Sequence, residues 1–299
     1  MSVLIVGSTA LDSIKTPLAE NPRLLGGSAS HAAVAASFFG PVKLVGVVGD
    51  DFPRKYVQLY RKHRIDLTGL QRQEGKTFHW AGEYELNMNH RRTLLTELGV
   101  FEKFTPHLPE AYKQSPFVLL ANIAPALQHH VLDQMQRPKF VIADTMDLWL
   151  NIALEDLLRL LKRVDAFVLN DSEAHQLTKE DNVFAAMKKI HKLGPRHVVI
   201  KKGSHGSILS GPQGFFICPA YPLHDVVDPT GAGDSFVGGM IGYLSNATGA
   251  VEKNLRRAMI YGSVVASFCC EGFGLNRTTR VKRADIERRV KDLQMLTRF

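Results

Sequence analysis

The sequence is poor in cysteine, with three in 299 residues. Small extracellular domains held together by disulfides need more, so we expect reduced thiols and a cytoplasmic protein. The chain has no apolar run of the roughly 20 residues that a membrane span requires. Its N-terminus lacks a basic region ahead of an apolar one, as a signal peptide would have. We therefore expect neither a membrane partner nor secretion.

Two common nucleotide-binding motifs are also missing. A dehydrogenase of the dinucleotide-binding class needs GxGxxG after its first strand, but residues 7–12 read GSTALD. The P-loop pattern GxxxxGK[ST] does not occur. The net charge is +8, yet the basic residues are dispersed, with no zinc-finger spacing and no aromatic-basic interleaving. We interpret them as a solvated basic surface and expect no nucleic-acid partner.

The sequence does contain a regular alternation of short β-branched runs and amphipathic stretches. The expected strands include residues 4–6, 44–48, 118–121, 140–143, 166–169 and 198–200. The expected helices include residues 29–39, 126–135, 154–161 and 183–193. Such alternation predicts an α/β fold with a mainly parallel sheet covered on both faces. Ligands of these sheets bind beyond the carboxyl ends of the strands, which is where Asp12, Asp144, Asn170 and Lys201 are expected.

The most informative stretch is VDPTGAGDSF at residues 227–236, directly before an apolar helical segment. Glycines at a helix start leave backbone N–H groups free, and these groups together with the helix dipole favour an anion. A carboxylate at the same place, Asp234, fits a base that deprotonates a nucleophile attacking a phosphate. An ordinary capped helix start is the alternative for a lone Gly-x-Gly-Asp. The longer run favours phosphoryl transfer.

This run resembles the second signature of the ribokinase-like (PfkB) carbohydrate kinase family. The resemblance implies that Asp234 is the catalytic base and that Gly231, Ala232 and Gly233 form the anion hole. It also implies a ribokinase-like three-layer αβα sandwich formed by residues 1–299 as a single kinase domain. A small β-lid would be formed by about residues 13–25 and 76–100.

Other family elements occur in the family's order along nearly the whole chain. By this resemblance the acceptor contacts are Asp12, Gly26, Gly27 and His31. The nucleotide contacts are Asn170, Glu173, Lys201, Gly203, Gly206 and Gly233, and the magnesium site is Glu173 with Asn170. Three positions depart from the usual family residues, namely Ala10, His31 and Lys201, and these leave the substrate open rather than the chemistry.

The lid region has its own sequence pattern. Residues 77–86 alternate with period two, which predicts a strand with an aromatic face comprising Phe78, Trp80, Tyr84 and Leu86. Residues 87–90 are the expected turn, and residues 91–98 the returning strand. The aromatic face could stack on a base, pack within the lid or form a homodimer contact. Polar groups at Asn87 and Asn89 suit a sugar or a nucleoside.

The resemblance implies an ATP-dependent kinase that uses Mg²⁺ and transfers the γ-phosphate to a hydroxymethyl group. Family breadth favours a sugar as the small-molecule acceptor, with a nucleoside kinase as the alternative and a non-catalytic binding relative as a remote one. Asp228 belongs either to a structural turn or to the monovalent-cation site of some relatives. Residues 271–274 are expected at the adenine pocket, and Tyr261 either there or in the core.

Overall fold

The computed structural model describes residues 1–86, 88 and 91–298. Its main element is a nine-stranded sheet with the order β13-β12-β11-β10-β9-β8-β1-β4-β5. These strands are β1 (Val3–Val6), β4 (Val42–Val48), β5 (Ile65–Arg72), β8 (Phe117–Leu120), β9 (Phe140–Asp144), β10 (Ala166–Asn170), β11 (His197–Lys201), β12 (Ser207–Gly211) and β13 (Gly214–Cys218). All neighbours from β11 to β5 pair in parallel, whereas β12 and β13 are antiparallel.

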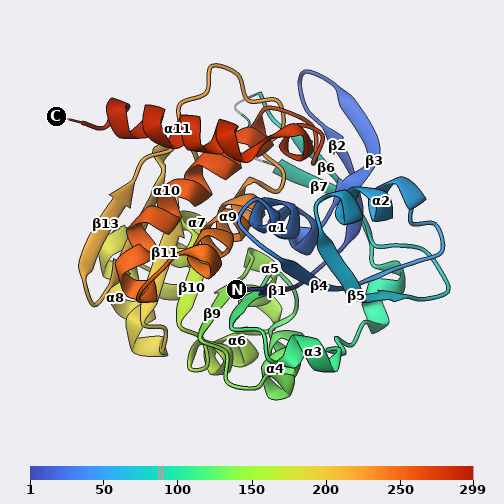
Figure 1. The fold of residues 1–299 in the computed structure, drawn as a ribbon, viewed down its shortest axis with the longest axis horizontal. Helices are drawn as coiled ribbons and strands as arrows, with labels where there is room; N and C mark the ends of the chain where they lie inside the picture. The colour runs from blue at the N-terminus through green and yellow to red at the C-terminus, as the bar shows by residue number, and fades with distance from the viewer. Residues whose placement is uncertain (87, 89–90, 299) are drawn as a thin grey trace.

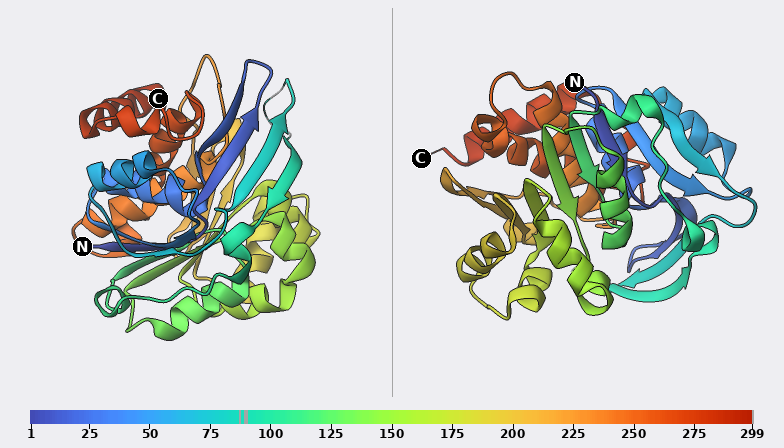
Figure 2. Two further views of the ribbon diagram at one scale, coloured as in Figure 1. Left: turned by 90° about the vertical axis from the view of Figure 1, so that its right-hand side faces the viewer. Right: turned by 90° about the horizontal axis from the view of Figure 1, so that it is seen from below.

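Helices cover both faces of this sheet (Figures 1 and 2). One face carries α1 (Ser28–Ser37), α2 (Arg54–Lys62), α9 (Ala232–Asn246) and α10 (Val251–Cys270), with α11 (Arg283–Leu296) packed outside α10. The other face carries α3 (Glu110–Lys113), α4 (Pro125–Gln134), α5 (Asp147–Ile152), α6 (Leu154–Leu161), α7 (Asp171–Thr178) and α8 (Val183–Leu193). Alternate residues of β1 enter the two cores, Val3 and Ile5 on one side and Leu4 and Val6 on the other. The predicted α/β sandwich is confirmed.

A second sheet of four strands stands beside the main body in the order β3-β2-β6-β7. It comprises β2 (Ala10–Lys15), β3 (Glu20–Gly26), β6 (His79–Tyr84) and β7 (Arg91–Glu97). The hairpin β2–β3 continues directly from β1, and β6 adds to β2 in parallel. The two segments expected to form a lid therefore lie side by side in one sheet, which we call the lid sheet.

The aromatic pattern of residues 77–86 is realised only in part. Trp80 and Tyr84 lie in β6, two pleats apart on one face. Phe78 precedes the strand and stacks on Phe101 with ring centroids 5.3 Å apart. Leu86 follows the strand and is 89% exposed. The prediction that all four share a face is wrong, because the hydrogen-bonded strand is shorter than the alternating stretch.

Three short 3₁₀ segments complete the described part of the chain: η1 (Gly99–Lys103), η2 (Gly203–His205) and η3 (Thr278–Arg280). The predicted turn at residues 87–90, with Asn87 and Asn89 as hydrogen-bonding groups, lies largely outside the described residues. No helix among residues 1–86, 88 and 91–298 is long and apolar enough to cross a bilayer.

Candidate active site

The start of α9 forms a cradle of backbone N–H groups, which we call the phosphate cradle (residues 229–234). Gly231 precedes the helix with φ of +76°, and a Cβ there would lie 2.3 Å from the His31 ring. Glycine is required on both counts. The Ala232 N–H donates to the Pro229 carbonyl oxygen at 3.1 Å. Among the described residues nothing accepts a hydrogen bond from the N–H of Gly231 or Gly233, so these two donors are available to an anion.

Asp234 lies in the first turn of α9, half-buried beside this cradle. Burial raises the pKa of its carboxyl above the usual range, while the positive charges of Lys201 and Arg91 oppose the rise. A carboxylate whose proton affinity is raised, yet which sits between two cations, is suited to accept a proton. It lies next to the free N–H groups, and its role as base stays a prediction.

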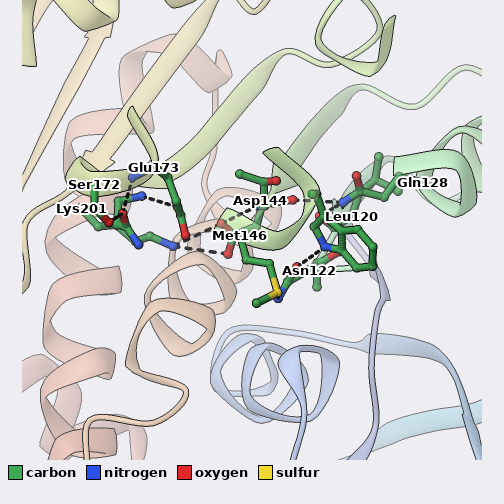
Figure 3. Close-up of polar contacts among 12 residues, drawn as sticks. Leu120, Asn122, Gln128, Asp144, Met146, Ser172, Glu173 and Lys201 are labelled. Atoms are coloured by element: carbon green, nitrogen blue, oxygen red, sulfur yellow. Dashed lines mark hydrogen bonds and ion pairs between the residues drawn. The ribbon is translucent and has the colours of Figure 1, made fainter. Parts of the chain in front are cut away.

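Lys201 brings a positive charge to the cradle from the carboxyl end of β11. Its Nζ lies 3.2 Å from Oδ1 of Asp144, at the end of β9 (Figure 3). A Cβ on Gly233 would lie 3.1 Å from the same Nζ. Burial works against the ammonium, but the carboxylates of Asp144, Glu173 and Asp234 raise the pKa of Lys201 above its ordinary value. The lysine therefore carries its charge where a phosphate oxygen could meet it.

Asn170 and Glu173 lie between these two strands, at the junction of β10 and α7. The Glu173 N–H donates to Oδ1 of Asn170 at 2.8 Å, and Oε2 of Glu173 accepts from the Asn170 N–H at 2.7 Å. This capping box fixes both side chains. Burial is the main cause that raises the pKa of Glu173 to about 7, and the charge of Lys201 opposes it. Figure 3 shows Glu173 beside Lys201, and the magnesium role expected of Glu173 and Asn170 stays a prediction.

Asp12 enters the same cleft from the lid sheet. Its Oδ2 accepts from the Gly27 N–H at 3.3 Å, and a Cβ on Gly26 would lie 1.8 Å from that oxygen. Glycine at residue 26 is thus needed for the carboxylate to approach the backbone. Burial raises the pKa of Asp12 to about 7, aided by the charges of Asp228 and Asp234. The acid expected to hold the acceptor therefore lies within electrostatic reach of the expected base.

His31 lies in the core beneath the cradle rather than at an open surface. It is 1% exposed, and its Nδ1 is 3.7 Å from Sγ of Cys269. Burial lowers the pKa of His31 to about 4, so the ring is neutral. Its Nε2 has no hydrogen-bonding partner in the described part of the chain. The ring supports Gly231 from behind, and its expected contact with an acceptor stays a prediction.

A cavity of about 820 Å³ extends from the cradle along α9 and α10. Its lining includes four of the predicted nucleotide residues, Lys201, Gly203, Gly206 and Gly233. The walls also include the loop of residues 221–226, which the sequence pattern did not single out. The one feature of the sequence that marks this loop is a proline in the segment before the glycine motif.

One expectation about the adenine pocket is corrected, and one open alternative is decided. Tyr261 packs in the core, stacked on Tyr243 at 4.4 Å, and its hydroxyl donates to Glu287. The loop of residues 271–274 does not line the cavity. Instead Gly274 approaches Leu24 of the lid sheet, and its N–H donates to Oδ2 of Asp228 at 2.9 Å. Neither position could be assigned from local sequence, because both are set by packing between distant elements.

Arg91 is a site residue that the sequence did not reveal. It begins β7, opposite Tyr84, with its guanidinium 5.3 Å from the centre of the Trp80 ring. Its charge opposes the rise in the pKa of both Asp12 and Asp234. An isolated arginine at the start of an expected strand has no sequence signature that would mark it.

The fold and this cleft define a class of protein. Free N–H groups at a helix start, a neighbouring acid, a buried lysine and a covering sheet are the parts of a phosphoryl-transferring kinase. The family model described as pfkB family carbohydrate kinase matches residues 13–281. The chain belongs to this family, whose members use ATP, and it is a phosphotransferase with a hydroxyl acceptor.

Individual relatives agree with this assignment. A cytidine kinase of Thermococcus kodakarensis is 30% identical over 248 residues, which cover 81% of this chain and 87% of the relative. The structure of a nucleoside kinase from Methanocaldococcus jannaschii superimposes with a TM-score of 0.78 at 20% identity, covering 97% and 98% of the two chains. A ribokinase from Thermotoga maritima gives a TM-score of 0.78 at 21% identity, covering 97% and 99%. At these identities the two structures establish the ribokinase-like fold.

Proposed function

We propose that this chain is an ATP-dependent nucleoside kinase that phosphorylates the primary hydroxyl of a riboside. The observation that carries the acceptor class is the position of Trp80. Trp80 and Asp12 are register partners in β6 and β2, so both project from the same face of the lid sheet. An aromatic ring thus stands beside the carboxylate expected to hold the ribose hydroxyls.

The Trp80 ring is held in one orientation by its neighbours. It lies over Gly82, where a Cβ would come within 2.1 Å of the ring. Its indole N–H donates to Oγ1 of Thr93 at 3.3 Å, and Arg91 lies against the ring. A fixed, half-buried indole offers a planar base a stacking partner that a free sugar does not need. The similarity to a cytidine kinase over most of both chains supports the same acceptor class.

The proposed reaction uses residues from all parts of the cleft. Asp12 and the backbone of Gly26 and Gly27 orient the acceptor. Asp234 accepts the proton of the primary hydroxyl as its oxygen attacks the γ-phosphorus, and the bond to the β,γ-bridging oxygen breaks to release ADP. The N–H groups of Gly231 and Gly233 and the ammonium of Lys201 balance the phosphoryl charge. Positioning and charge stabilisation supply most of the rate in such transfers.

The residues present fit a magnesium ion that retains most of its water. Of the two carboxylate oxygens of Glu173, Oε2 accepts a hydrogen bond from the Asn170 N–H. Oε1 has no partner among the described residues, so it is free for a metal-bound water. No cluster of three acidic, cysteine or histidine side chains in that part of the chain forms a metal cage, and Mg²⁺ commonly relies on phosphates and water instead. The ion would supply charge neutralisation of the phosphates. Glu173 and Asn170 would hold its water shell.

We further propose that the lid sheet closes over the acceptor and excludes water from the cleft, which suppresses hydrolysis of ATP. The free thiols of Cys218, Cys269 and Cys270 fit the cytoplasm as the place of this reaction.

A panel of acceptors tests the proposed function. The enzyme is incubated with ATP, Mg²⁺ and either a nucleoside or a free sugar, and ADP release is measured. We expect at least one riboside to exceed ribose, fructose and other free sugars by about tenfold or more in kcat/KM, the scale of one good stacking contact. Higher turnover of a free sugar would replace the nucleoside assignment with the carbohydrate one. Absence of turnover with any acceptor would argue for a binding relative.

Acceptor binding is expected to depend on pH through Asp12. Burial raises the pKa of its carboxyl to about 7, and the ionised form accepts hydrogen bonds from hydroxyls more strongly than the protonated form does. Acceptor affinity should therefore rise as pH increases through about 7 and fall below it. Calorimetric titration of the acceptor without ATP between pH 5.5 and 8.5 measures this effect. In Asp12→Asn the affinity should be weak and flat with pH; an unchanged slope in that variant would assign the titration to another group.

A further inference from the structure

We infer that Tyr84 is a positioning residue that holds the phosphate cradle in place from the lid sheet. The inference rests on the proposed kinase function but not on the identity of the acceptor. Tyr84 is the last residue of β6, and Thr230 directly precedes Gly231 in the cradle. Oγ1–H of Thr230 donates to the Tyr84 hydroxyl at 3.1 Å. The bond connects segments 146 residues apart in sequence.

This hydrogen bond is shielded from water. Tyr84 is 7% exposed and Thr230 is 8% exposed. Burial is the main cause that raises the pKa of the Tyr84 phenol, so the hydroxyl stays protonated and remains a neutral partner. Loss of one partner would leave the other buried polar group unsatisfied, which costs more than the bond itself contributes. A buried bond between lid and cradle can therefore control where the cradle sits.

Thr230 is already held by its backbone on two sides. Its N–H donates to Oδ1 of Asp228 at 2.9 Å, and its carbonyl oxygen accepts from the Cys269 thiol at 3.3 Å. The Tyr84 hydroxyl adds a third hydrogen bond, and among the described residues it is the only hydrogen bond from the lid sheet to Thr230. Because Gly231 follows directly, the orientation of Thr230 decides where the free N–H groups point. Tyr84 thus acts on the reacting phosphate through Thr230.

Tyr84 also links the cradle to the charge of Arg91. The two residues face each other in the register of β6 and β7, and the charge of Arg91 acts on both Asp12 and Asp234. We expect loss of the hydroxyl bond to let the paired ends of β6 and β7 shift, which would move the charge of Arg91 away from the two acids and raise their pKa. A shift in the pH profile therefore distinguishes loss of this hydrogen bond from a simple loss of packing.

The test removes the hydroxyl alone with Tyr84→Phe. We expect kcat to fall about five- to tenfold while the KM for the acceptor changes less than threefold, since the acceptor contacts at Asp12 remain. The acid limb of the kcat–pH profile should move to higher pH. The matched control is Tyr112→Phe, whose lost hydroxyl donates to the Asp66 carbonyl oxygen at 3.0 Å, away from the cleft. The control should show neither change.

A double-mutant cycle completes the test. Thr230→Val removes the other partner, and the double variant with Tyr84→Phe should be no slower than the slower single variant. Thr230→Ser keeps the hydroxyl and should recover most of the turnover lost in Thr230→Val. Wild-type kcat and pH profile in Tyr84→Phe, or losses that multiply in the double variant, would overturn the inference. ADP release by the wild-type enzyme is measured with each acceptor in the same experiment. If the wild-type enzyme releases no ADP, the proposed kinase function fails, independently of the role of Tyr84.

Discussion

Replacing Asp234 by asparagine is expected to reduce kcat by about 10³-fold, within the range that a positioned general base contributes. The side chain keeps its shape, but the amide cannot accept the hydroxyl proton. Asp234 is the acid placed in the first turn of α9 beside the free N–H groups of the cradle. Single-turnover measurements with saturating ATP and acceptor would isolate the chemical step.

Nucleotide affinity is expected to survive this change. Removal of a negative charge near the phosphates should leave the Kd for ATP equal or lower, as fluorescence titration would measure. Asp285→Asn is the matched control, because Asp285 is also a first-turn acid, in α11, where it accepts from the Lys282 N–H at 2.9 Å. Normal turnover of Asp234→Asn would refute the role of Asp234 as base. Loss of ATP binding in it would instead indicate a structural role.

Replacing Lys201 by methionine is expected to lower kcat by about 10²- to 10³-fold, the scale of removing one preorganised donor from a developing charge. The change removes the ammonium that lies against Gly233. It also leaves the Asp144 carboxyl, whose side chain is 5% exposed, without its cation. An unpaired buried charge of this kind destabilises a protein by about 3–5 kcal/mol. Steady-state kinetics and thermal unfolding would measure the two losses.

A second variant separates stability from chemistry. In Lys201→Met/Asp144→Leu both charges are gone, so the melting temperature should recover while kcat stays low. Lys189→Met is the control for losing a lysine, since Lys189 pairs with Glu180 at the surface. If Lys201→Met keeps the wild-type kcat and KM for ATP, the ammonium does not contact the phosphates. The pair with Asp144 would then be purely structural.

Much of the main body could be predicted from short-range patterns. Residues 154–161 and 183–193 were expected as helices and are α6 and α8 with the same bounds. Their apolar residues recur at helical spacing, and that spacing alone decides which face is buried. The strand stretches were recognisable for a related reason, since strands buried on both faces read as continuous β-branched runs. The cradle was predictable because the left-handed backbone angle found at Gly231 strongly favours glycine.

The lid sheet was harder to predict from the same signals. Period-two alternation located the strand but extended it over Phe78 and Leu86, which lie outside β6. Alternation describes side-chain polarity, whereas the ends of a strand are decided by its hydrogen-bonding partners. The same limit applies to Tyr261, whose place in the core depends on Phe39, Tyr243 and Glu287.

The sequence by itself determined the fold class, the family and the local form of the phosphate cradle, because each depends on neighbouring residues along the chain. Only the tertiary structure decided which side chains meet in the cleft. Asp144 pairs with Lys201, Tyr84 binds Thr230 and the charge of Arg91 acts on the two acids because separate strands end at one edge and the lid sheet lies beside it. Such contacts carry no local pattern, since their free energy depends on distances that exist only in the folded chain.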